Sequence, residues 1–175
     1  MDVYKILTFP DPFLTTVAKP VEKSDDDLER IIETMINTMY NYVGVGLAAT
    51  QVGIDKRLFV VDVNYNKDDP DSQKNPIVII NPEIVSESDM QSAEEGCLSV
   101  PEFRAEVQRF TKITLQYQNI NLEDQIIEAE GLFAICIQHE LDHLNGKLFI
   151  DRLRPLQRKI IKTKLKKKAS DNSRN

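Results

Sequence analysis

Apolar residues near the N-terminus of the chain recur at the spacing of a helix. In "SDDDLERIIETMINTMYNY", residues 24–42, they fall three or four positions apart and therefore share one helical face. Ser24 is expected to be the N-cap, because the aspartates after it suit the positive end of the helix dipole. The predicted apolar face consists of Leu28, Ile31, Ile32, Met35, Ile36 and Met39.

The middle of the chain has the composition of short β-strands. Four segments are rich in β-branched residues and are separated by polar or proline-containing stretches, which is typical of strands joined by turns. They are "RLFVVDV" (57–63), "IVIINPEIV" (77–85), "KITLQYQNI" (112–120) and "QIIEAE" (125–130). Residues 64–76, between the first two, are predicted to form a surface loop.

Helical spacing returns in the last third of the chain. "GLFAICIQHELDHLNG", residues 131–146, predicts a helix of about four turns that is buried on nearly all sides and ends at the Asn-Gly pair. Pro155 suits the first turn of a last helix. Its narrow apolar stripe consists of Leu156, Ile160, Ile161 and Leu165. The order of the elements predicts an α+β fold, in which mixed or antiparallel strands pack around the buried helix.

Composition narrows the class of protein. The 175 residues are 41% hydrophobic and 29% charged, which is ordinary for a globular domain and predicts neither disorder nor a disulfide scaffold. The N-terminus does not resemble a secretory signal, and no apolar stretch approaches the roughly 20 residues that cross a bilayer. We therefore expect a single cytoplasmic domain over residues 1–168 and a disordered tail over residues 169–175.

Charge is distributed unevenly along the chain. Residues 1–151 carry 12 Lys and Arg against 27 Asp and Glu, whereas residues 152–168, "RLRPLQRKIIKTKLKKK", carry nine Lys and Arg and no acid. Such a basic segment indicates a polyanionic partner. A solvated segment that neutralises the acidic body agrees equally well with the composition.

Both histidines of the chain, His139 and His143, lie in "QHELDHLNG", residues 138–146. Residues four apart lie on one face of a helix, so the two imidazoles can bind one metal ion. Glu140 can then approach a metal-bound water without being a ligand, as a general base does in metal-assisted hydrolysis. A motif this short also arises by chance, but burying these polar side chains is unfavourable unless each has a strong partner, and a metal ion supplies one.

A catalytic site of this kind has three protein ligands and one open position. The chain holds no third histidine, so a carboxylate or a cysteine is needed. Cys97 in "EEGCLSVP" is a candidate, because Gly96 and the residues up to Pro101 indicate a backbone held in a turn or at a strand edge. Cys136 is predicted to be a small buried hydrophobe. A Cys-His-His site suits iron, zinc, cobalt or nickel.

A third segment, "GVGLAATQVG" (44–53), is less specific. Its glycines can simply form a tight backbone bend. Alternatively, they let the backbone approach the site while Gln51 directs its amide at a developing oxyanion.

Together the three segments resemble those of the bacterial peptide deformylases. That family is marked by a Gly-x-Gly-Leu-Ala-Ala-x-Gln, a Glu-Gly-Cys-Leu-Ser and a Gln-His-Glu-x-Asp-His-Leu-x-Gly segment, in this order. Here they are "GVGLAATQ" (44–51), "EGCLS" (95–99) and "QHELDHLNG" (138–146). The similarity extends from "ILTFPDPFLTTVAKPVE" to "GKLFIDRLRPLQR" and covers nearly the whole chain. The acidic loop 64–76 and the turn "NINLEDQ" differ from the corresponding segments of many relatives. Both lie outside the three motifs, so the difference concerns only the periphery of the molecule.

The resemblance implies a catalytic domain that removes the formyl group from N-formylmethionyl nascent peptides during protein biosynthesis. Cys97, His139 and His143 would bind one Fe²⁺, for which Ni²⁺, Co²⁺ or Zn²⁺ can substitute. Glu140 would be the general acid and base. The Gln51 amide and the backbone N–H of Leu98 would stabilise the oxyanion.

The resemblance also implies how substrate and partners bind. The glycine segment would hold the peptide backbone, an apolar pocket would take the methionine side chain, and Arg104 would lie near the second and third residues of the peptide. The other residues of these contacts are Gly44, Val45, Gly46, Leu132, Ile135 and Cys136. The basic helix over residues 152–168 would dock on ribosomal RNA, and neither a membrane nor DNA is an expected partner.

The residues by themselves also agree with two other classes of function. A general metalloprotease agrees with the His-Glu-x-x-His motif. A non-catalytic binding protein whose fold is held by a closed metal site is the second, although such a site usually needs a fourth Cys or His ligand.

Overall fold

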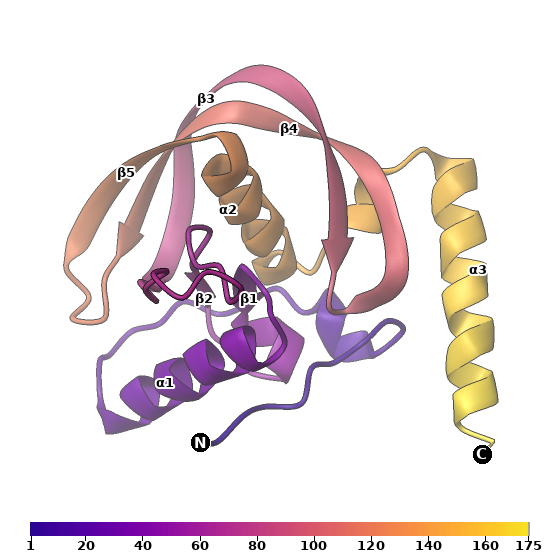
Figure 1. Cartoon of the computed structure of the whole chain (residues 1–175), viewed down its shortest axis with the longest axis horizontal. Coiled ribbons are helices and arrows are strands. Elements are labelled where there is room, and N and C mark those ends of the chain that lie inside the picture. The colour runs from indigo at the N-terminus through magenta and orange to yellow at the C-terminus, as the bar shows by residue number, and fades with distance from the viewer. Residues whose placement is uncertain (175) are drawn as a thin grey trace.

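The computed structural model describes residues 1–174, which contain three α-helices and one five-stranded antiparallel sheet (Figure 1). The predicted α+β class is therefore confirmed. The helices are α1 (Asp26–Asn41), α2 (Gly131–Leu144) and α3 (Pro155–Asn172). The strands, in their order across the sheet, are β1 (Gly46–Ala48), β2 (Leu58–Val61), β3 (Ile77–Cys97), β4 (Val100–Gln118) and β5 (Asp124–Glu130). Short 3-10 helices are η1 (Pro12–Thr15), η2 (Ala49–Val52) and η3 (Phe149–Arg152).

Strands β3 and β4 form a long hairpin that arches over α2 (Figure 1). They run for 21 and 19 residues, well beyond the segments 77–85 and 112–120 that composition predicts. The additional residues are rich in charged side chains, which strands usually lack. Alternate residues of β4 nevertheless point inward, because Ala105, Val107 and Arg109 are all buried. This period of two is that of a strand with one buried face.

The glycine segment contains a strand that composition does not predict. Gly46 and Ala48 of β1 pair with Val61 and Phe59 of β2. Since β1 is the first strand in the order of the sheet, one of its two edges has no neighbouring strand.

Helix α1 packs through the predicted apolar face. Leu28, Ile32, Met35 and Met39 are buried, and the other two members of the face, at 31 and 36, are partly buried. The N-cap is Asp25, whose carboxylate accepts the N–H of Leu28 at 3.0 Å. The prediction of Ser24 as the cap is wrong by one residue. Aspartate and serine cap helices about equally well, so the sequence pattern cannot separate two adjacent candidates.

Helix α2 lies beneath the β3–β4 arch (Figure 1). Ala134 and Ile137 are completely buried in a core cluster with Phe59 and Ile79 of the sheet. The first turn is less enclosed, because Leu132 is 56% exposed. Gly131 has a φ of 62°, a conformation that side chains other than glycine rarely adopt, so it allows the abrupt change from β5 into the helix.

Helix α3 stands at the side of the molecule and packs through a narrower stripe than predicted (Figure 1). Ile161 and Leu165 are buried, but Leu156 and Ile160 are 72% and 47% exposed. Successive residues of a helix point about 100° apart. Leu156 and Ile160 each precede a residue on the buried face or its continuation by one position, and therefore point away from that face. None of the helices in residues 1–174 combines the length and the apolar character that a bilayer crossing requires.

The bounds of α3 also differ from the prediction of a helix over residues 152–168 and a disordered tail over residues 169–175. Arg152 belongs to η3, and α3 continues to Asn172, so the predicted tail is wrong for residues 169–172. These four residues contain neither Gly nor Pro, and nothing in them stops the helix. Residue 175 lies outside the described part of the chain.

Candidate metal centre

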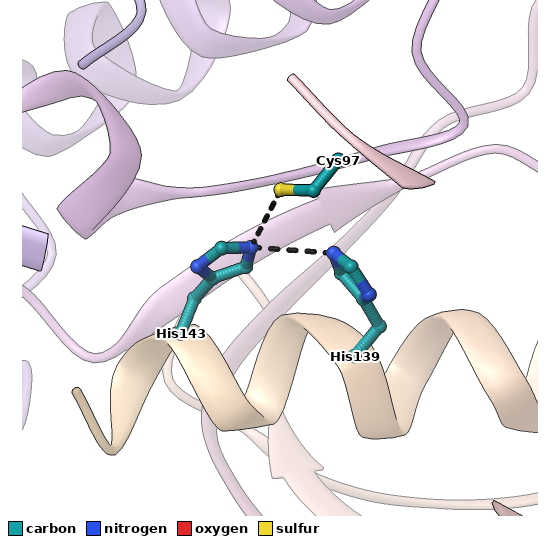
Figure 2. A group of neighbouring side chains, drawn as sticks. All are labelled: Cys97, His139 and His143. Atoms are coloured by element: carbon teal, nitrogen blue, oxygen red, sulfur yellow. Dashed lines mark hydrogen bonds between the residues drawn. The ribbon is translucent and has the colours of Figure 1, made fainter. Parts of the chain in front are cut away.

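Three side chains from two elements converge beneath the hairpin. His139 and His143 project from one face of α2, and Cys97 is the last residue of β3 (Figure 2). The Nε2 atoms of the two histidines are 3.3 Å apart, and Cys97 Sγ is 3.3 Å from His143 Nε2. Two nitrogen ligands of a tetrahedral metal are about 3.4 Å apart when each bond is about 2.1 Å. The three residues predicted as ligands therefore lie together at a spacing that fits one metal ion.

The surroundings of Cys97 favour the thiolate, which is the form that binds metals. Burial opposes ionisation, but His143 and His139 outweigh it and hold the pKa of the Cys97 thiol well below its usual value. The backbone N–H of Ser99 also donates to Cys97 Sγ at 3.4 Å. Cys136 is different, because burial and the carboxylates of Glu140 and Glu95 raise the pKa of its thiol to about 12. It stays a neutral, buried thiol, as predicted.

A buried carboxylate orients the first histidine. Glu95 Oε1 lies 2.7 Å from His139 Nδ1, so the other ring nitrogen faces the two remaining ligands. Arg109 Nε and Nη2 donate to the two oxygens of Glu95 at 2.7 and 2.8 Å. Burial acts to raise the pKa of Glu95, but Arg109 and His139 outweigh it and lower the pKa to about 2. A carboxylate behind a histidine ligand fixes the tautomer and the direction of the ring.

The same arginine joins a second carboxylate of α2. Arg109 Nη1 donates to Asp142 Oδ2 at 2.7 Å, and Arg152 of η3 donates to both oxygens of Asp142 at 2.6 and 2.7 Å. Arg109 and Asp142 are only 1% and 5% exposed. A continuous chain of ion pairs thus runs from the metal centre to η3, just before α3.

Sequence reasoning missed this network. Glu95 and Asp142 lie within the two segments that carry the ligands, which is the one signal that could have drawn attention to them. Arg109 lies in "EVQRFTK". Because charged residues are usually at the surface, this polar stretch predicts an exposed arginine. The fold places this side chain inward, where Arg109 is buried between Glu95 and Asp142.

Glu140 lies next to the ligands and is almost fully buried, with 4% exposed. Burial raises the pKa of its carboxyl. Its Oε2 atom has no hydrogen-bond partner among the described residues. A Cβ atom at Gly46 would be 2.6 Å from Glu140 Oε1, so only glycine allows β1 to pass the carboxylate at this distance.

Gln51 presents the nitrogen of its side-chain amide to the centre. Its Oε1 accepts the N–H of Ala48 at 3.0 Å. Its Nε2 lies 3.1 Å from Ser99 Oγ and 3.5 Å from Cys97 Sγ. The predicted hydrogen-bond donor therefore faces the sulfur of Cys97.

These groups lie in a groove of about 640 Å³. Its walls come from the glycine segment and from the hairpin end, and α2 contributes to its lining. Arg104 is 62% exposed at its side chain and pairs with Glu94 at 3.6 Å. All of the predicted site residues line the groove except His143, which is 1% exposed. The predicted substrate residues among them are Gly44, Val45, Gly46, Arg104, Leu132, Ile135 and Cys136.

Comparison with known proteins identifies the family. A family model described as polypeptide deformylase matches residues 3–159. The chain belongs to this family. The peptide deformylase of Tolumonas auensis is 51% identical over 169 residues, which are 97% of this chain and 98% of that protein.

Solved structures of peptide deformylases have the same fold. The crystal structure of the Legionella pneumophila enzyme superposes with a TM-score of 0.88, at 45% identity and over 99% of each chain. The Acinetobacter baumannii enzyme, solved with Met-Ala-Ser bound, superposes with a TM-score of 0.80 at 36% identity, over 86% of this chain and 98% of that chain.

The family assignment fixes the reaction. The chain is a metal-dependent hydrolase that removes the formyl group from the N-terminal methionine of nascent peptides. This activity is the one that the resemblance implies. The family assignment therefore favours deformylation over the two other classes of function, a general metalloprotease and a binding protein with a structural metal.

Proposed function

We propose that Cys97, His139 and His143 hold one divalent cation and that Glu140 is the general acid and base of deformylation. The observation that carries this proposal is the buried Oε2 atom of Glu140, which lines the groove with Cys97 and His139 but has no hydrogen-bond partner within residues 1–174. A buried polar atom without a partner destabilises the fold by about 1–3 kcal/mol. Its retention next to a metal-binding group indicates that substrate and water are its partners during catalysis.

The division of chemical work follows from the positions of the side chains. When bound, the cation supplies Lewis acidity, which acidifies water and polarises the formyl carbonyl. Glu140 takes the proton from the attacking water and delivers it to the departing amine. The Gln51 Nε2–H and the backbone N–H of Leu98 donate to the oxygen on which negative charge develops. The products are formate and a free N-terminal methionine.

The groove also supports a mode of peptide binding. The free edge of β1 can take the peptide backbone as an added strand, a common form of recognition. Leu132, Ile135 and Cys136 of α2 then offer an apolar surface to the methionine side chain. Arg104 at the hairpin end would contact the second and third residues of the peptide. The Acinetobacter baumannii enzyme was solved with Met-Ala-Ser bound, a tripeptide that begins with methionine.

Replacing Glu140 tests the catalytic assignment. Glu140→Gln should keep the metal and lower kcat/KM on a formyl-Met peptide by about 10²–10⁴-fold, the usual contribution of general acid-base catalysis. Glu94→Gln is the matched control, because Glu94 also lines the groove but its side chain is 65% exposed. Wild-type turnover by a metal-loaded Glu140→Gln enzyme would contradict the assignment.

We further propose that the cation in the cell is ferrous iron. A thiolate together with two imidazoles is a soft donor set that suits iron, and nickel, cobalt or zinc can replace it. Because iron beside a thiolate is open to oxygen chemistry, activity should decay in air and persist longer with nickel. Anaerobic purification with metal analysis and a formyl-Met-peptide assay on the same sample tests this proposal. Equal lifetimes under air and nitrogen would contradict iron.

The basic helix α3 supports a ribosomal partner in the cytoplasm. Lys164, Lys166 and Lys167 are exposed, and their charge suits the phosphates of ribosomal RNA. Truncation after residue 151 is a poor test, because it removes Arg152 together with the buried Ile161 and Leu165. Neutralising the three exposed lysines to Gln leaves these anchors in place.

The triple Gln variant should bind ribosomes more weakly. The slope of log affinity against log salt should become shallower by about 2–3, because each phosphate contact contributes roughly 0.7–0.9. Lys5, Lys67 and Lys147 are exposed lysines elsewhere on the surface, and their triple Gln variant is the matched control. Equal salt slopes for the two triple variants would contradict docking through α3.

A further inference from the structure

Gln51 has its amide fixed at both ends. The oxygen accepts the N–H of Ala48 at 3.0 Å, and the nitrogen lies 3.1 Å from the hydroxyl oxygen of Ser99. Gln51 is 2% exposed and Ser99 is completely buried, so water does not compete for these contacts. Because a backbone N–H can only donate, the amide oxygen must be the end that faces Ala48.

The nitrogen of Gln51 carries two hydrogens, and only one of them can be directed at Ser99. The amide group is planar, so fixing the first N–H also fixes the direction of the second. Cys97 Sγ lies 3.5 Å from the same nitrogen, on the side of the metal-binding group. This contact is a long hydrogen bond from the second N–H to the sulfur, so the second N–H points at the metal-binding group, where an oxygen acceptor bound there can take the place of the sulfur.

We propose that Ser99 is a positioning residue for deformylation, whose hydroxyl sets the direction of the second N–H of Gln51 toward the developing oxyanion. The proposal rests on the oxyanion role proposed above for Gln51. Preorganised donors of this type contribute to catalysis because they need no reorientation when the charge forms. The Ser99 side chain is completely buried and does not line the groove, so its hydroxyl would act through Gln51.

The other contacts of Ser99 come from its backbone. Its N–H donates to Cys97 Sγ at 3.4 Å, and its carbonyl accepts the N–H of Phe9 at 2.8 Å. An alanine at position 99 keeps both. The hydroxyl is therefore separable by mutation from the support that this residue gives to the sulfur ligand and to the N-terminal segment.

A double-mutant cycle between Ser99 and Gln51 tests the proposal. Ser99→Ala should lower kcat on a formyl-Met peptide by roughly 5–50-fold, the effect of losing one buried hydrogen bond, with KM changed less than about twofold. In a Gln51→Ala background the same substitution should change kcat by less than about twofold, because the group it orients is gone. Ser99→Thr, which keeps a hydroxyl, should recover most of the activity.

Two further measurements separate positioning from a merely structural effect. Thr38→Val removes another completely buried hydroxyl, on α1 and outside the lining of the groove, and should leave kcat unchanged in both backgrounds. In the zinc-loaded enzyme, the side-chain amide resonances of Gln51 should shift in Ser99→Ala and stay in place in Thr38→Val. Should Ser99→Ala fail to fold, Ser99→Cys retains the shape with a weak acceptor, and the same cycle applies once its metal content is shown to be one per chain.

The outcomes distinguish the two assignments. If Gln51→Ala alone keeps wild-type kcat, the oxyanion role of Gln51 is wrong and the inference about Ser99 falls with it. If Gln51→Ala is impaired but Ser99→Ala is fully active, or lowers kcat equally in both backgrounds, Gln51 keeps its role and Ser99 is not a positioning residue.

Discussion

Helices α2 and α3 place their polar side chains in opposite surroundings. Helix α2 carries Glu140, Asp142 and His143 into the interior, where they are 4%, 5% and 1% exposed. Helix α3 keeps its lysines at the surface and is attached to the body mainly by Ile161 and Leu165. The two helices are adjacent in sequence, and only η3 and short connections separate them.

The difference lies in where the partners of the charges come from. Asp142 on α2 is matched by Arg109, 33 residues earlier in the chain, and by Arg152, 10 residues later. No local rule of helix formation supplies such partners. In α3, by contrast, solvent satisfies the exposed charges, and burial of a few apolar side chains is sufficient for docking. We therefore expect α2 to depend on long-range ion pairs and α3 on apolar contacts.

Removing Arg109 should have the largest effect on stability. Arg109→Ala leaves Glu95 without its main partner in a buried site, so the free energy of unfolding should fall by about 3–5 kcal/mol. Affinity for the metal should fall about 10–100-fold as well, because Glu95 no longer holds His139 in place. Chemical denaturation and metal titration measure the two effects.

Arg104→Ala is the matched control for this variant. Arg104 lies on the same strand, but its pair with Glu94 has side chains that are 62% and 65% exposed. Exposed ion pairs contribute about 0–1 kcal/mol, so this variant should stay close to the wild type. If Arg109→Ala and Arg104→Ala lowered the free energy of unfolding equally, burial of the ion pairs would not explain their contribution to stability.

Shortening Leu165 should have the next largest effect. Leu165 is 3% exposed and packs in a cluster with Val107 and Phe149. Leu165→Ala should lower the free energy of unfolding by about 2–3 kcal/mol, because it removes apolar contact and leaves a cavity. Ile160→Ala on the same helix should change it by less than about 1 kcal/mol, since Ile160 is already 47% exposed. Similar losses would show that α3 is not attached through one face.

Local patterns predicted the helices well, and the reason is visible in α1 and α2. The apolar face of α1 and the paired histidines of α2 both follow from spacing along one element, which the sequence displays directly. The convergence of Gln51, Cys97 and His139 was predicted because three segments resemble those of one family. Without the resemblance, the residues indicate the two histidines and Glu140, and leave Cys97 as one candidate ligand and Gln51 as one of two interpretations of the glycine segment.

Long-range pairing is what the sequence did not reveal. The charged halves of β3 and β4 are strands because they pair with each other, and neither half has strand composition by itself. The burial of Arg109 depends on that pairing, and so does its contact with Asp142. The end of α3 was misjudged for a different reason, since a basic stretch followed by polar residues resembles a disordered tail unless its packing is known.

Removing Arg152 should have a smaller effect than removing Arg109. Arg152 donates twice to Asp142 but is itself 43% exposed at its side chain, so solvent screens part of the interaction. After Arg152→Ala, Asp142 still has Arg109 as a partner, and the free energy of unfolding should fall by about 1–2 kcal/mol. Arg154→Ala, two residues later and exposed, is the control and should have no measurable effect. A loss as large as that of Arg109→Ala would mean that η3 supports the network more than the strand does.

Neutralising the exposed lysines of α3 should have the smallest effect on stability. The Gln variants of Lys164, Lys166 and Lys167 remove charges that make no ion pair among the described residues, so each should change the free energy of unfolding by less than about 0.5 kcal/mol. Lys162 provides the contrast, because it pairs with Asp151 at 2.8 Å and its side chain is only 33% exposed. Its Gln variant should be the less stable one in thermal denaturation. If the three exposed lysines prove neutral for stability, any loss of ribosome binding in their combined variant reflects the surface of α3 and not a partly unfolded helix.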